Sequence, residues 1–218
     1  MHFWLSTFLL LSSVQAFEQK YFQVEIPATG FKEITVSQAI QALQRKSLDI
    51  KGSELGFNYV FTKKASSQLN QKISLNLTRL PLFEAIKYTA LVAGLQVKYE
   101  RGTVIFLAAK EKYKDPIIQD KLIKLKPQLL STLRLKSGHY NFNDISLSQA
   151  IKKIQQQSRE IDPLKKGVNV LIIKADSSAK INLDSQGLSF YSLLKYISLS
   201  SGVQMKLDSS AIILTNKM

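Results

Sequence analysis

The stretch that decides the fold is E-I-T-V-S-Q-A-I, from Glu33 to Ile40, because it returns 111 residues later as D-I-S-L-S-Q-A-I, from Asp144 to Ile151. Further matches follow in the same order across about 75 residues, first at an offset of 111 and then, after a three-residue shift, at 108. They are F-N-Y-V with V-N-V-L, K-I-S-L-N with K-I-N-L-D, F-E-A-I-K-Y with Y-S-L-L-K-Y, Gly94 with Gly202, and T-V-I-F with A-I-I-L. Colinear matches of this extent indicate two copies of one small domain.

Each copy begins with the pattern of a strand and a helix. Ile34 and Val36 alternate with polar residues, which is typical of a short strand that buries one face. Ser37 and its counterpart Ser148 each offer a hydroxyl group that is expected to cap the helix that follows. Apolar residues then recur at helical spacing, namely Ala39, Ile40 and Leu43 in the first copy and Ala150, Ile151 and Ile154 in the second.

The rest of each copy predicts two paired strands, a second helix and a hairpin. Pro81 and Ser189 stand where the second helix is expected to start, and Gly94 and Gly202 where it is expected to end in a left-handed conformation. The expected strands cover Phe57 to Phe61, Ile73 to Leu77, and a hairpin that turns at Arg101-Gly102, with the corresponding segments in the second copy. The predicted fold class is α+β, as two tandem copies of a small βαββαββ sandwich domain.

The first 16 residues are typical of a secretory signal peptide. An apolar run from Phe3 to Leu11 is too short to span a bilayer, and Val14-Gln15-Ala16 suits cleavage between Ala16 and Phe17. The alternative is an uncleaved N-terminal anchor. The predicted organisation is a signal peptide over 1–16, a first domain with a lead-in strand over 17–109, a basic linker over 110–120, and a second domain with its own lead-in strand over 121–218.

The chain has no cysteine, which excludes disulfides, thiolate metal sites, cysteine nucleophiles and a lipid-modified cysteine. An exported protein of this kind must be held together by packed cores. A signal peptide without disulfides favours a bacterial envelope, so we expect a periplasmic or otherwise exported protein.

The formal net charge is +14, and lysines are densest between residues 110 and 136. A basic surface attracts anionic polymers, lipid head groups and nucleic acid. Lys121, Lys124 and Lys126 are the candidate binding residues, and solvated surface lysines are the alternative. A basic amphipathic helix at a membrane surface over 117–135 would be another possibility, but Pro127 in its middle argues against it.

Catalytic patterns are missing from the sequence. Of the two histidines, His2 lies in the expected signal peptide and His139 in an expected turn, and no phosphate-binding loop or G-x-S-x-G motif is present. The sequence therefore predicts no catalytic, cofactor-binding or metal-ligating residue and no small-molecule substrate. Asn58 and Asn169 occupy matching positions at the start of a strand. They could form a polar contact site, or their side chains could cap the preceding loop onto the strand. The aromatic residues are candidates for base or sugar stacking or for the core, namely Phe57, Tyr59, Phe61, Tyr88 and Tyr99.

The order of elements resembles the short N-terminal domain of secretins and TonB-dependent transducers. The residues that carry the resemblance are I-T-V-S-Q-A-I from Ile34, K-I-S-L-N-L from Lys72, P-L-F-E-A-I from Pro81, Gly94-Leu95 and V-I-F from Val104, with their second-copy matches. The loop with Asp162-Pro163 and the stretch G-V-N-V from Gly167 look most like envelope proteins of the Planctomycetes and Verrucomicrobia group. These motifs are core and capping positions, so they indicate fold better than function.

The resemblance implies a periplasmic module that contacts partner proteins. No pore domain or outer-membrane barrel follows in this chain, which implies an effector supplied in trans, such as an outer-membrane channel or a secretion component. The leading hypothesis is therefore a non-enzymatic interaction module that uses an exposed sheet edge or helix face. The rival is a polyanion binder whose affinity falls steeply with salt, and an enzyme is the third hypothesis.

Overall fold

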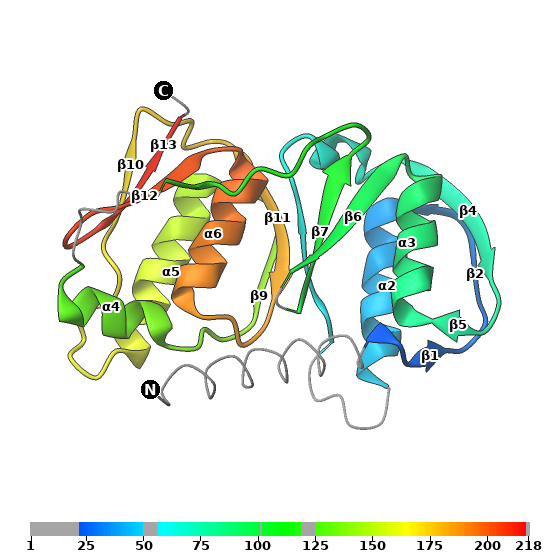
Figure 1. The fold of residues 1–218 in the computed structure, drawn as a ribbon, viewed down its shortest axis with the longest axis horizontal. Helices are drawn as coiled ribbons and strands as arrows, with labels where there is room; N and C mark the ends of the chain where they lie inside the picture. Colours follow the sequence, from blue (N-terminus) through cyan, green and yellow to red (C-terminus); the bar gives the residue numbers. More distant parts are fainter. Residues whose placement is uncertain (1–21, 50–55, 101, 119–124, 217–218) are drawn as a thin grey trace, which may run out of the picture. The chain divides into compact units, whose positions relative to one another are not determined.

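The computed structural model describes residues 22–49, 56–100, 102–118 and 125–216 (Figure 1). They form an α+β structure that divides into two compact units. One unit holds the described residues up to Phe57 together with Ser67–Ala109, and the other holds Asn58–Ser66 together with the described residues from Lys110 onward. A short segment from within the expected first domain thus groups with the second unit.

The first unit packs two helices between strands. β2 and β4 form one antiparallel pair, β1 and β5 a second, and β6 and β7 an antiparallel hairpin. Helices α2 and α3 pack against each other and lie between the β2–β4 pair and the β6–β7 hairpin (Figure 1). The elements are β1 (Glu25–Ile26), β2 (Thr29–Thr35), α2 (Val36–Leu48), β4 (Lys72–Leu77), β5 (Leu80–Pro81), α3 (Leu82–Val92), β6 (Leu95–Glu100) and β7 (Thr103–Ala108).

The second unit has the same kind of layering. β11 pairs antiparallel with β9 on one side and with β3 on the other, and a four-stranded sheet runs in the order β10-β13-β12-β8. Helices α5 and α6 pack together, and α4 packs on α6. The elements are β3 (Asn58–Phe61), β8 (Ile117–Ile118), α4 (Pro127–Arg134), β9 (Tyr140–Ser146), α5 (Leu147–Ile161), β10 (Val170–Ile173), β11 (Lys180–Ser185), α6 (Phe190–Ser201), β12 (Gln204–Leu207) and β13 (Ile212–Thr215), and the short helix η1 (Ala65–Gln68) follows β3.

The strand that enters the first helix has the same irregularity in both units. The β2–β4 register shifts between Phe31 and Ile34, and the β9–β11 register shifts between Ile181 and Leu183. Glu33 and Asp144 take positive φ angles of 51° and 56° at these bulges. Their backbone N–H groups are held by side chains of the facing strands, Ser74 Oγ and Asn182 Oδ1, each at 3.0 Å.

Both first helices start with a capping box, but two residues earlier than the sequence suggested. The expected caps Ser37 and Ser148 already lie inside the helices, so this prediction was wrong. Thr35 and Ser146 are the caps, and each accepts from the backbone N–H of a glutamine three residues on, at 3.2 Å. The last strand residue stays extended while its hydroxyl group turns back to the helix, so one residue ends the strand and caps the helix.

The predicted strands and helices are present, but the expected pairing of neighbouring strands is wrong. β3 does not pair with β4, because β4 pairs with β2; likewise β10 pairs in parallel with β13, and β11 with β9. α4 was not predicted as a helix. Pro127 is its first residue, where the missing proline N–H costs nothing.

The helix ends and the cores agree with the predicted pattern. Gly94 and Gly202 have φ angles of 68° and 75°, as expected for left-handed residues after a helix. The buried stripe of α2, including Ala39, Ile40 and Leu43, is fully buried. Within the described part of the chain, no helix combines the length and apolar character needed to cross a bilayer.

Candidate functional site

Strand β10 combines an unbroken apolar sequence with a position at a sheet edge. Its residues are V-L-I-I, and it ends the sheet order β10-β13-β12-β8. Its second edge faces no strand within the residues that the structure describes. A run of four apolar residues is typical of a strand buried on both faces, whereas natural edge strands are normally protected by charge, proline or a bulge.

The outward side chains of β10 are exposed. Leu171 is 42% exposed and Ile173 is 43% exposed, while Val170 points inward and is buried. Leu171 lies opposite Ile213 of β13, which is half-buried, and Asn169 just before the strand is exposed. Asn169, Leu171, Ile173 and Ile213 are called the β10 surface below. Large apolar side chains at an open sheet edge are typical of an interaction site.

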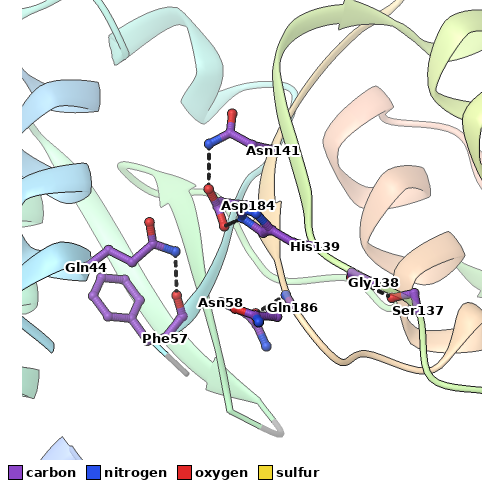
Figure 2. A network of polar contacts seen from close by, with 9 residues as sticks. All are labelled: Gln44, Phe57, Asn58, Ser137, Gly138, His139, Asn141, Asp184 and Gln186. Atoms are coloured by element: carbon purple, nitrogen blue, oxygen red, sulfur yellow. Dashed lines mark hydrogen bonds and ion pairs between the residues drawn. The ribbon is translucent and has the colours of Figure 1, made fainter. Parts of the chain in front are cut away.

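A side chain of α5 makes a polar contact with the outer edge of β10. The carbonyl oxygen of Val170 accepts a 3.3 Å hydrogen bond from Gln155 Nε2 of α5. The first unit has a related contact, in which Gln44 Nε2 donates to Phe57 O at 2.9 Å (Figure 2). A carbonyl oxygen can accept two hydrogen bonds, so this contact leaves acceptor capacity for an added strand.

Strand β3 belongs to the sequence segment that matches β10, but it is paired with β11 at the edge that corresponds to the open edge of β10. Val60 is fully buried, and β3 pairs with β11 so that Val60 faces Leu183 and Tyr59 faces Asp184. Asn58 adds a side-chain contact at the end of this pairing, because its Oδ1 accepts from Gln186 N at 2.7 Å (Figure 2). Asn58 thus ties the bend that follows β11 to the start of β3, and its use as a contact site for a partner stays a prediction.

A second polar cluster lies on β9 and β11. Asp184 is buried, and its carboxylate accepts from Asn141 Nδ2 at 2.6 Å and contacts His139 Nε2 at 3.1 Å (Figure 2). The His139 side chain is 56% exposed. These contacts hold β9 against β11 and satisfy a carboxylate that would be costly to bury alone. Among the described residues, no group of three or more histidine, aspartate or glutamate side chains could hold a metal ion.

The loop after α5 is organised around a buried carboxylate. Asp162 accepts hydrogen bonds from the backbone N–H groups of Leu164, Lys166 and Gly167 at 2.9–3.2 Å, and contacts Thr132 Oγ1 at 3.4 Å. Burial alone would raise the pKa of Asp162, but the hydrogen bonds from Gly167, Leu164, Lys166 and Thr132 together outweigh burial and lower it. Asp162 is thus an ionised structural group that fixes the loop before β10.

The lysine site predicted from the sequence lies mostly outside the described residues, because Lys121 and Lys124 are not among them. The predicted signal cleavage site, Ala16 and Phe17, also lies outside the described residues. Lys126 is exposed and precedes α4, and its backbone N–H donates to Ser209 O at 2.8 Å.

The aromatic candidates divide into core residues and partly exposed residues. Phe57, Tyr59 and Phe61 are buried, which excludes them as stacking platforms. Tyr88 and Tyr99 are 42% and 38% exposed, and the Tyr99 hydroxyl group donates to Phe83 O at 3.1 Å. Burial, and to a smaller extent the charge of Glu84, raises the pKa of Tyr99.

The β10 surface was missed by the sequence reasoning. The apolar run from Val170 to Ile173 was the available sign, since a half-buried strand would alternate apolar and polar residues. A comparison of the chain with protein-family models, curated proteins and solved structures gave no match.

Proposed function

We propose that this chain is a non-enzymatic module of a bacterial cell envelope that binds a partner protein through the edge of β10. The observation that carries the proposal is an apolar edge strand that has no second strand partner among the described residues and exposes Leu171 and Ile173. Strand addition satisfies the free backbone groups of such an edge, and the exposed side chains provide specificity.

The proposal includes two tandem copies of one βαββαββ domain. It is supported by local features that recur at the sequence offsets of the matching segments. The bulge residues Glu33 and Asp144, the capping residues Thr35 and Ser146, and the facing strand partners all correspond. Ser47 Oγ donates to Gln44 O, and Ser158 Oγ donates to Gln155 O in the same way.

The proposed location is the periplasm or another exported compartment. The signal-like first 16 residues and the absence of cysteine support it. The resemblance to secretin and TonB-transducer domains suggests an envelope protein as partner, such as an outer-membrane channel or a secretion component. The proposal includes no cofactor and no small-molecule substrate.

The test is capture of partners on immobilised residues 17–218 from a native envelope extract, with washes at low and then high salt. The matched baits are Leu171→Lys, which places a charge on the β10 surface, and Leu91→Lys, which makes the same change at a 67% exposed leucine of α3. We expect one discrete protein that the wild-type and Leu91→Lys baits retain at high salt and that Leu171→Lys loses. Equal retention by all three baits would refute binding through β10.

A polyanion-binding function is the second candidate, and it is favoured by the net charge of +14. Lys110, Lys112, Lys114 and Lys126 are exposed among the described residues. Replacing Lys121, Lys124 and Lys126 with glutamine would then weaken binding to an acidic polymer and reduce its salt dependence. Under this candidate Leu171→Lys leaves binding intact, so the two functions give opposite results with the same variants.

A further inference from the structure

The pairing of β3 with β11 shows how an edge strand of the β10 type is covered in this chain. The two strands run antiparallel, with Val60 opposite Leu183 and Tyr59 opposite Asp184. Val60 is fully buried, and Leu183 is 1% exposed. Asn58 Oδ1 closes the end of the pairing on the N–H group of Gln186.

Both β3 and β11 have a counterpart strand that keeps one edge without a strand partner in the described part of the chain. At the offset of 111, Val60 corresponds to Leu171 of β10, which is 42% exposed. At the offset of 108, β11 corresponds to β4, whose only strand partner in the described residues is β2. Asn76 of β4 is exposed, whereas its counterpart Asp184 is 4% exposed.

The free strands also match the covered strands in register. Gly30 faces Asn76 in the β2–β4 pair, as Asn141 faces Asp184 in the β9–β11 pair. Both pairs contain a bulge at the corresponding place, so they present similarly shaped edges. An edge like the one that receives β3 is therefore present on β4.

We propose that β10 of one molecule pairs antiparallel with β4 of a second molecule of the same chain, in the way that β3 pairs with β11. In this register Leu171 lies opposite the partner's Leu75, and Val170 lies opposite the partner's Asn76. Asn169 Oδ1 then accepts from the backbone N–H of the partner's Thr78, as Asn58 accepts from Gln186. The inference rests on the proposed function and names its partner as a second copy.

Such a contact joins different surfaces of the two molecules, so each molecule keeps one free β10 edge and one free β4 edge. Contacts of this kind continue head to tail until they close into a ring or grow as a filament. The net charge of +14 opposes the approach of two copies, and salt screens this repulsion. Self-association is therefore expected to strengthen with salt, which is opposite to polyanion binding.

The absence of cysteine allows a direct test, because every thiol in a variant is one that was introduced. The full chain carrying both Leu75→Cys and Leu171→Cys is oxidised mildly and analysed on a non-reducing gel. Directly opposed residues of an antiparallel pair have Cβ atoms close enough for a disulfide. We expect a ladder of covalent oligomers from this variant, and no ladder from the control with Leu75→Cys and Leu91→Cys.

Sedimentation velocity over a range of concentrations and salt tests the same contact without cross-links. The wild-type chain and Leu91→Lys are expected to self-associate, whereas Leu171→Lys and Asn76→Lys alone stay monomeric. A mixture of these two monomeric variants is expected to form a 1:1 dimer, because each supplies the edge that the other has lost. All three substituted positions are exposed, Leu91 at 67%, Leu171 at 42% and Asn76 on β4, so circular dichroism is expected to show unchanged folding.

A wild-type chain that is monomeric at every concentration and salt would overturn the inference. Self-association that Asn76→Lys leaves intact would also overturn it, because it would indicate β10 pairing with β10. The proposed function fails by a different result, namely envelope capture that Leu171→Lys does not weaken. If the chain is monomeric but its capture of an envelope protein depends on Leu171, the inference of a second copy is wrong and the proposed function stands.

Discussion

Replacement of Asp162 tests whether one buried carboxylate holds the loop that leads into β10. Asp162 is 3% exposed, and three backbone N–H groups point at its two oxygens. Asp162→Ala leaves these donors without their acceptor. Donors that water cannot reach cost about 1–3 kcal/mol each, but Leu164 and Lys166 lie in exposed positions where water can replace the carboxylate. We therefore expect a loss of about 2–4 kcal/mol in the free energy of unfolding.

The measurement is urea unfolding of Asp162→Ala, Asp162→Asn and Asp176→Ala beside the wild type. Asp162→Asn keeps one carbonyl oxygen and is expected to lose about half as much as Asp162→Ala. Asp176 makes similar local hydrogen bonds to Ser178 but is exposed, so Asp176→Ala is expected to lose clearly less. Equal losses for Asp162→Ala and Asp176→Ala would refute the argument that burial makes the difference.

The same carboxylate gives a pH dependence of known sign. The pKa of Asp162 is lowered in the folded chain, because hydrogen bonds from Gly167, Leu164, Lys166 and Thr132 outweigh the opposing effect of burial. Its contribution is complete above the unfolded pKa of about 3.9 and is lost as pH falls through the folded pKa. The wild type should therefore lose more stability than Asp162→Asn on acidification below about pH 4. Parallel curves for the two proteins would contradict this expectation.

Three further predictions concern helix ends and the core. Thr35→Ala and Ser146→Ala each remove a capping box and should cost about 1 kcal/mol in urea unfolding, whereas Ser146→Thr should cost little. Leu43→Ala opens a cavity at a fully buried position and should cost about 2–5 kcal/mol, with a matching fall in the urea midpoint. Gly94→Ala and Gly202→Ala force an alanine to φ angles of 68° and 75° and should each cost about 1 kcal/mol, measured by thermal unfolding; an unchanged melting temperature would contradict the strain.

Local features of the fold could be predicted from the sequence. Gly94 and Gly202 indicated where helices end, because glycine has no Cβ atom and adopts the left-handed conformation at a helix end without steric cost. The spacing of Ala39, Ile40 and Leu43 indicated a helix face, and that face is buried. The predicted start of the first helix, at Ser37, lies two residues after the observed cap, Thr35. Thr35 is both the last residue of the strand and the cap of the helix, and the sequence alone does not show this double position.

Strand partners and the candidate site could not be predicted in the same way. Alternation shows which side chains share a face, but it does not say which strand lies alongside. Tyr59 pairs with Asp184, and nothing near Tyr59 in the sequence points to that distant strand. The β10 surface arises because β10 has one strand neighbour among the described residues. Leu171 and Val60 belong to matching sequence segments, although Leu171 is exposed and Val60 is buried. Whether α4 forms a helix depended on Pro127 standing at its start and not in its interior.

The placement of β3 in the second unit affects how the chain folds as it is made. Asn58 and its hydrogen-bond partner Gln186 are 128 residues apart, so β3 cannot pair with β11 until most of the polypeptide has been synthesised. Until then the segment Phe57–Phe61 is an apolar strand without its neighbour β11. Contacts of such long range slow folding and leave strands open to aggregation. Folding intermediates of the newly made chain are therefore expected to expose this segment, where a chaperone that holds unfolded chains could bind.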